Sequence, residues 1–169
     1  FAINVACSLA DHWPWGPLRL GFALTHASML IVLAGALVTD MLKVEGRLAL
    51  LEGEESHLFS TPGGNEAATA ELPFSVRLEA FEIDYYPGTD RPAMFRSRVL
   101  VTDLASRGAF PAVIEMNREL PYDGYRFFQS SYQQTPQGEQ SILLVSRDPG
   151  QPIVFAGYAL LMAGMGTVL

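Results

Sequence analysis

The stretch LGFALTHASMLIVLAGALVT, residues 20–39, decides the fold of this chain. It carries no formal charge, and Arg19 and Asp40 stand immediately outside it. About 20 residues rising 1.5 Å each span the hydrocarbon core of a bilayer, which is about 30 Å thick. A soluble surface helix would be amphipathic, and a secretory signal would have a shorter apolar core behind a basic leader. The stretch therefore predicts a transmembrane helix.

His26 is an ionisable side chain inside this apolar stretch. It lies about 10 Å of helix rise from the Arg19 end. Ionisable groups at such depth are costly, and they are candidates for function by default. An imidazole there can be a metal or haem ligand, a proton relay or a buried hydrogen-bond partner. The residues alone leave these alternatives open.

Apolar segments also occupy both ends of the chain. Residues 1–10, FAINVACSLA, resemble the last turns of a longer, truncated transmembrane helix, in which Cys7 is expected to be a small buried hydrophobe. Residues 11–19 are predicted to form a short loop, whose Trp13 and Trp15 suit a bilayer interface. Residues 152–169 are expected to start a further, truncated transmembrane helix. Its glycines, and the small residues 34–36, would let this helix pack antiparallel against residues 20–39.

The polar middle of the chain, residues 40–151, carries 10 Lys and Arg against 17 Asp and Glu, and hence all of the net charge of −7. This sign argues against a nucleic-acid partner. Alternation of apolar and polar residues over 74–80 predicts a strand, with a bulge near Ala80 and a hairpin partner at 95–101. Further strands are predicted within 42–54, where the chain turns at Gly53, and at 110–116, 125–132 and 141–148. Between them, His57 is expected in an acidic turn, residues 60–71 in a loop and residues 117–124 in a turn. The middle is therefore predicted to be an all-β domain of six to eight strands, either a sandwich or an open barrel.

Several other groups are weaker site candidates. His12 beside two tryptophans suggests a haem platform, although an interfacial role is favoured. His57 near Glu54 and Glu55 would need more ligands to hold a metal. An aromatic group could line a ligand groove, but a core role is favoured; it comprises Tyr122, Tyr125, Phe127, Phe128 and Tyr132. Arg118 and Arg126 suit a carboxylate or propionate, or are ordinary surface charges.

Four stretches follow one another over nearly the whole chain past Leu20. They are THASMLIVLAGALVT running into VEGRLALLEGEES, then LPFSVRLEAFEIDYYPGTDRPAMFRSRVLV, NRELPYDGYRFFQSSY and SRDPGQPIVFAGYALLMAG. Together they resemble the ResB (CcsB) family of cytochrome c biogenesis proteins. The resemblance implies a subunit of a system II cytochrome c synthase, which carries haem across the membrane and attaches it to apocytochrome c.

The resemblance also implies a site and partners. His26 matches a family histidine that ligates haem b in transit, and the second axial histidine belongs to a CcsA/ResC-like membrane partner, separate or fused. The attachment chemistry is implied to lie on that partner. Apocytochrome c, thiol–disulfide reductants and membrane lipid are further implied contacts. The β domain is expected on the outer side of the bacterial cytoplasmic membrane, which leaves residues 11–19 as a cytoplasmic loop.

Two rival functions use the same residues. In a structural ResB-like subunit, the β domain only docks partners and His26 is a packed, hydrogen-bonded core residue. In a b-type haem electron-transfer subunit, His26 would ligate a permanent redox haem.

Overall fold

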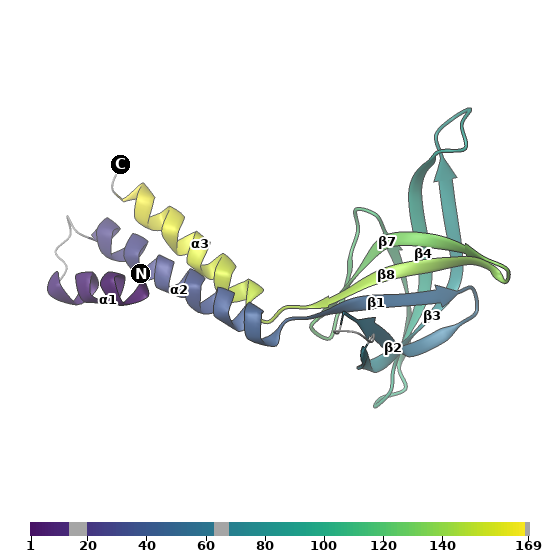
Figure 1. Cartoon of the computed structure of the whole chain (residues 1–169), viewed down its shortest axis with the longest axis horizontal. Coiled ribbons are helices and arrows are strands. Elements are labelled where there is room, and N and C mark those ends of the chain that lie inside the picture. Colours follow the sequence, from purple (N-terminus) through teal and green to yellow (C-terminus); the bar gives the residue numbers. More distant parts are fainter. Residues whose placement is uncertain (14–19, 63–67, 168–169) are drawn as a thin grey trace. The chain divides into compact units, whose positions relative to one another are not determined.

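The computed structural model describes residues 1–13, 20–62 and 68–167. The chain divides into two compact units (Figure 1). One unit is helical and comprises Phe1–Lys43 with Asp148–Leu169. The other comprises Val44–Arg147 and contains all of the strands. The N- and C-terminal segments thus build one unit, and the middle of the chain builds the other.

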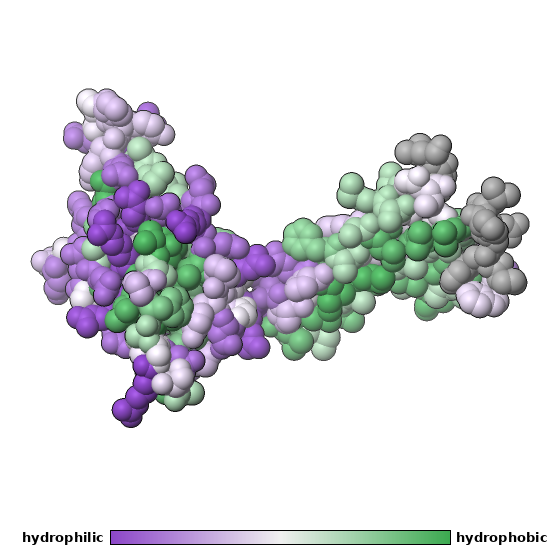
Figure 2. Space-filling model, turned by 180° about the vertical axis from the view of Figure 1, so that it is seen from behind, coloured by the Kyte–Doolittle hydropathy of each residue, from purple (hydrophilic) through white to green (hydrophobic). Residues whose placement is uncertain are grey.

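The helical unit contains α1 (Ala2–Asp11), α2 (Leu20–Leu42) and α3 (Gln151–Gly166). The predicted helix over residues 20–39 is confirmed, and it extends to Leu42. Of the helices that the structure describes, α2 is the one long and apolar enough to cross a membrane, whereas α1 and α3 are apolar but shorter. Hydrophobic residues dominate the surface of this unit in Figure 2. Cys7 was expected to be buried, but it is exposed on α1.

Helices α2 and α3 are antiparallel neighbours, as the sequence predicts, and glycines line their contact. A Cβ atom on Gly157 would lie 2.6 Å from the Val32 side chain, and one on Gly164 would lie 2.8 Å from the backbone nitrogen of Thr25. Such close approach of two backbones is possible only for the smallest residues. Gly166 was predicted to join this contact, but no described atom lies within 4 Å of its Cβ position.

The middle unit is a single sheet of eight antiparallel strands. They are β1 (Val44–Leu51), β2 (Glu55–Thr61), β3 (Ala68–Tyr85), β4 (Pro92–Asp103), β5 (Ala109–Glu115), β6 (Leu120–Tyr122), β7 (Tyr125–Thr135) and β8 (Gly138–Arg147). Their order is β5-β4-β3-β2-β1-β8-β7-β6, so β5 and β6 are the two edges. Across this seam the rings of Phe110 and Tyr122 lie 5.0 Å apart. The sheet is therefore a near-closed barrel rather than a sandwich.

The predicted strand pattern is mostly right, with two omissions. The β3–β4 hairpin and its irregularity at Leu78/Ala80 are confirmed. Residues 55–61 were predicted as an acidic turn and loop, but they form β2. The turn predicted at 117–124 contains the three-residue strand β6. The sequence did not predict these two strands, because each is short and shows little alternation of apolar and polar residues.

Side chains fill the barrel interior. Phe74, Val76 and Leu78 of β3 are 1%, 0% and 0% exposed, and they meet Phe127 of β7 in the same core. Eight strands enclose a space just wide enough for side chains.

Three polar side chains also lie inside the barrel, buried among the apolar ones. Ser97 of β4 donates to Gln129 Oε1 at 2.6 Å and lies 2.8 Å from the hydroxyl of Ser141. Gln129 in turn donates to Ser141 at 3.1 Å. Burial of polar groups costs little when each has a partner, so the three strands share one satisfied network.

Candidate functional site

His26 lies on α2, one turn after Phe22. Its Nδ1 is 2.9 Å from the Phe22 carbonyl oxygen, and its ring centroid is 3.9 Å from that of Phe22. A carbonyl oxygen only accepts, so Nδ1 carries the proton in this bond. The neutral ring then presents an unprotonated Nε2. In the described part of the chain, both hydrogen bonds of His26 involve Nδ1 and leave Nε2 available.

The hydroxyl groups next to His26 bond to carbonyls of their own helix, which continues without a break. Thr25 donates to the carbonyls of Gly21 and Phe22 at 2.9 and 3.0 Å, and Ser28 donates to the Thr25 carbonyl at 2.6 Å. Both hydroxyls are therefore satisfied within the helix. They therefore do not compete for the free nitrogen of His26.

The imidazole of His26 faces away from α3. The α2 residues that meet α3 include Thr25, Val32 and Gly35. At about 100° per residue, these positions lie between about 100° and 180° around the helix from His26. Leu33 and Leu37 lie within about 20° of His26 and are 41% and 59% exposed. The face of α2 that carries His26 is therefore apolar and is not covered by α3.

The junction of α2 and α3 is fixed by Asp148. Its Oδ1 accepts the Thr39 hydroxyl at 2.8 Å and the backbone N–H groups of Gly150 and Gln151 at 3.0 and 3.2 Å. A carboxylate at the first turn satisfies otherwise unpaired N–H groups and favours the positive end of the helix. A Cβ on Gly150 would collide with the carbonyl oxygen of Gly35 at 2.3 Å. The junction thus sets the register that places His26 relative to α3.

His12 was a minor candidate in the sequence, and the structure places it near His26. It follows the last residue of α1, where its Nδ1 is 2.8 Å from the carbonyl oxygen of Ser8. Its ring centroid is 5.3 Å from that of Phe22. Both histidines therefore contact the same phenylalanine, a proximity that no spacing in the sequence reveals. Trp13 is 69% exposed, and Trp15 lies outside the described residues.

The remaining candidates on the barrel form no shared site. His57 is exposed on β2, while Glu54 accepts the backbone N–H of Leu51 at 2.8 Å and Glu55 accepts the hydroxyl of Ser75. Over the described ranges, no three His, Cys, Asp or Glu side chains are grouped to hold a metal ion. Arg126 pairs with Glu119 at 3.5 Å on the surface. Arg118 lies in the tight turn after β5, where its backbone bridges to that of Glu115.

The aromatic group is mainly core, as favoured from the sequence. Tyr125 and Phe127 are buried on the inner face of β7, and Tyr132 packs against Phe81 and Phe95. Two surface hollows on the barrel, of about 450 and 320 Å³, lie elsewhere, beside Gly46 and Thr61 and beside Glu52 and Glu139. The buried members of the group therefore stabilise the barrel core, and the group lines neither of these two hollows.

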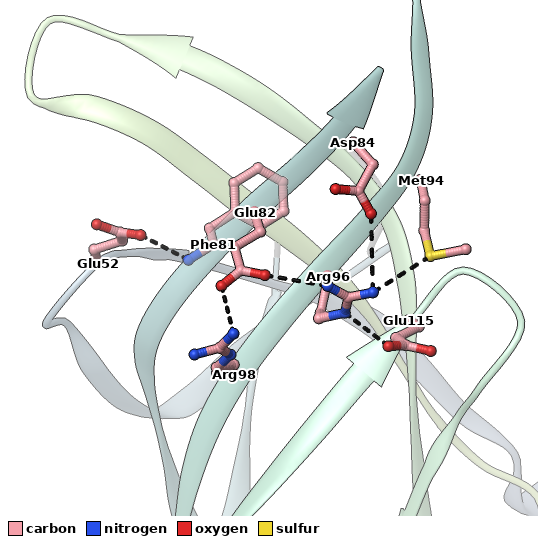
Figure 3. A network of polar contacts seen from close by, with 8 residues as sticks. All are labelled: Glu52, Phe81, Glu82, Asp84, Met94, Arg96, Arg98 and Glu115. Atoms are coloured by element: carbon pink, nitrogen blue, oxygen red, sulfur yellow. Dashed lines mark hydrogen bonds and ion pairs between the residues drawn. The ribbon is translucent and has the colours of Figure 1, made fainter. Parts of the chain in front are cut away.

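A network of ion pairs covers part of the outer face of β3, β4 and β5 (Figure 3). Arg96 contacts Glu115 at 2.7 Å, Glu82 at 3.2 Å and Asp84 at 3.8 Å, and Glu82 also pairs with Arg98 at 2.7 Å. Hydrogen bonds to Glu115 and Glu82 raise the pKa of Arg96 above its ordinary value. Glu82 and Glu115 are the cross-strand neighbours of Arg96, so the network links three strands.

The turn after β4 holds a carboxylate whose pKa is perturbed, that of Asp103. The backbone N–H groups of Ser106 and Ala105 donate to Asp103 at 2.7 and 2.8 Å, and they lower its pKa below the ordinary value. Tyr122 of β6 donates to the other oxygen of Asp103 at 3.4 Å. Burial, and then the charge of Asp103, raise the pKa of Tyr122. This contact joins β4 to the edge strand β6.

Comparison with known proteins adds three findings. Residues 18–144 match the ResB-like family. Protein NrfI of Wolinella succinogenes is 43% identical over 94 residues, which are 56% of this chain and 10% of that protein. The cytochrome c biogenesis protein CcsB of Thermosynechococcus vestitus is 28% identical over 116 residues, which are 68% of this chain and 26% of that protein. The chain thus spans about a quarter of CcsB and a tenth of NrfI.

A solved structure shows the same fold. The cytochrome c haem lyase CcmF superposes with a TM-score of 0.52 at 13% identity, over 99% of this chain and 29% of that one. At such low identity the likeness concerns the fold alone.

Proposed function

Because the chain belongs to the ResB-like family of cytochrome c biogenesis proteins, we propose that it is part of the haem-handling subunit of a system II cytochrome c synthase. In this proposal His26 is one axial ligand of haem b in transit across the membrane. The observation that carries the proposal is the hydrogen bond from His26 Nδ1 to the Phe22 carbonyl. It fixes the tautomer whose Nε2 is ready to bind iron.

The surroundings of His26 fit a haem ligand. Histidines that bind metals usually donate their other ring N–H to a carbonyl or carboxylate, which orients the ring and raises its basicity. When bound, haem supplies an iron that accepts one nitrogen on each axial side. This chain supplies Nε2 of His26, and the α2 face around it provides apolar contact for the macrocycle.

The second axial ligand is proposed to come from a CcsA/ResC-like partner. The face of α2 that carries His26 points away from α3, and its exposed leucines, Leu33 and Leu37, would suit a further helix. A histidine left facing lipid would be costly, so this face gains stability from a covering partner or a bound haem. The barrel would then lie on the outer side of the bacterial cytoplasmic membrane, where it positions apocytochrome c or braces the partner.

The proposal predicts that His26→Ala depletes bound haem. The full-length protein would be purified with its partner in detergent, and haem would be measured as the pyridine haemochrome. The expected result is a loss of at least about tenfold, because losing even an outer-shell partner of a metal ligand costs about that much, with recovery when free imidazole is added. His57→Ala is the matched control, because His57 is an exposed barrel histidine that should leave haem unchanged.

Equal haem in wild type and His26→Ala would contradict this role and favour the structural, partner-docking function. A stable haem that titrates reversibly and is not depleted by apocytochrome c would instead indicate a b-type electron-transfer subunit. The two rivals therefore give different results in the same preparation.

A further inference from the structure

His12 has the same ligand-ready arrangement as His26. Its Nδ1 lies 2.8 Å from the Ser8 carbonyl oxygen, four residues earlier, just as Nδ1 of His26 lies 2.9 Å from the Phe22 carbonyl oxygen. The carbonyl can only accept, so Nδ1 of His12 is the protonated nitrogen and Nε2 carries the free electron pair. His12 is exposed, whereas His26 is half-buried. The helical unit therefore offers two imidazoles that bond a helix carbonyl through Nδ1 and leave Nε2 outside that bond.

The two imidazoles are close because both contact Phe22. Their ring centroids lie 5.3 Å and 3.9 Å from that of Phe22, so they can be no farther apart than the sum of these distances. Phe22 precedes His26 by one helical turn, about 5–6 Å of rise. His12 thus lies beside the part of α2 that is nearer its N-terminal end. A ligand that reached His26 from that end would meet the exposed imidazole first.

We infer that His12 is an accessory ligand for haem iron that loads His26. The inference rests on the proposed function, and it adds an entry route to the same site. The bond from iron to Nε2 of His12 breaks as the bond to Nε2 of His26 forms. Each histidine ligates through Nε2 of its neutral ring, so the exchange needs no change in oxidation state. Phe22 provides an aromatic surface that both imidazoles share.

The test follows the rate and the extent of haem loading separately. Haem-depleted full-length protein with its partner, in detergent, is mixed with haemin, and the Soret band is recorded over time. The variants are His12→Ala, His12→Phe, His26→Ala and the control His57→Ala. His12→Phe keeps an aromatic ring against Phe22 but removes the nitrogen, so it separates ligation from packing.

The expected result is that both His12 variants load about tenfold to a hundredfold more slowly, the range seen when metal sites lose a supporting group. Their final haem content and spectrum should match the wild type, and free imidazole should restore the rate of His12→Ala. His26→Ala should retain a small, weakly held haem fraction that disappears when His12 is also replaced.

Three results would overturn the inference while leaving His26 as a ligand. The first is loading at the wild-type rate in both His12 variants. The second is slow loading in His12→Ala but wild-type loading in His12→Phe, and the third is a lower final haem content in both His12 variants. The last would make His12 a resident ligand rather than a loading one. Unchanged haem in His26→Ala would instead remove the proposed function itself, so the two failures are distinguishable.

Discussion

Asp103 shows how a single carboxylate can stabilise a turn. Two backbone N–H groups donate to it, and its pKa is lowered in the folded protein. A group whose folded pKa lies below its unfolded value of 3.8 adds stability above that pH. This contribution is lost as the pH falls through the folded pKa.

We therefore expect Asp103→Asn to lower the melting temperature at pH 7 and to reduce the slope of stability against pH below about pH 4. Thermal unfolding between pH 2.5 and 7, followed by circular dichroism, would measure both effects. Glu79→Gln, at an exposed carboxylate on β3, should change neither. An unchanged acid slope in Asp103→Asn would show that these hydrogen bonds do not stabilise the turn.

The sequence alone singles out His26, but it does not reveal that His12 contacts the same phenylalanine. His26 is conspicuous because it interrupts an apolar stretch. His12 stands beside Asp11 and Trp13, and only its contact through space with Phe22 brings it near His26. The ring tautomers are likewise set by helix carbonyls four residues earlier, and they become visible only once the backbone is folded.

The contact of α2 and α3 depends on which glycines face the partner helix. A Cβ on Gly164 would lie 2.8 Å from the Thr25 backbone nitrogen and 3.0 Å from Leu24 Cβ, while Gly166, two residues later, is open. Overpacking of this kind typically costs about 1–3 kcal/mol. Gly164→Ala should therefore separate the helices near His26, whereas Gly166→Ala should not.

The expected outcome is a lower melting temperature and a weaker Soret band for Gly164→Ala than for Gly166→Ala in detergent-purified protein. Matching values for the two variants would mean that α2 and α3 separate without affecting Thr25 or its neighbour His26. The comparison controls for helix propensity, because both variants replace glycine by alanine in the same part of α3.

The strands that the sequence did not predict are those without an alternating apolar pattern. Residues 55–61 form β2, although Phe59 is their one fully buried side chain and the rest are polar or partly exposed. β2 exists because it pairs with β1 and β3, not because of its own pattern. In contrast, the hairpin of β3 and β4 was predictable, since its inward residues alternate up to the bulge.

The first and last strands of the middle unit pair with each other at the centre of the sheet. β1 pairs with β8 along its whole length, from Val44 opposite Arg147 to Leu51 opposite Gln140. The ends of this unit are thus adjacent, and its core needs no residue from outside Val44–Arg147. The choice between sandwich and barrel was not predictable, because both give the same alternation.

A fragment of residues 40–151 should therefore fold alone. We expect it to be soluble when produced without the helices, with β-type circular dichroism and a single cooperative melting transition. The face of this unit drawn in Figure 2 is largely hydrophilic around a smaller hydrophobic area, which supports solubility. An aggregated fragment, or one that melts without cooperativity, would show that the helices are needed for the barrel to form. A fragment ending at residue 135 lacks β8 and should not fold.

The filled interior of the barrel leaves no path for a ligand through its centre. Phe74 and Phe127 occupy the lumen together with the hydroxyls and amide of Ser97, Gln129 and Ser141. A flat, rigid molecule the size of a porphyrin has no passage through a tube whose axis is already occupied. The barrel is thus a packed core and not a channel. Any substrate that meets this unit must travel along its outer wall, where the chemistry of exposed strands and loops, not that of a lumen, determines what is admitted.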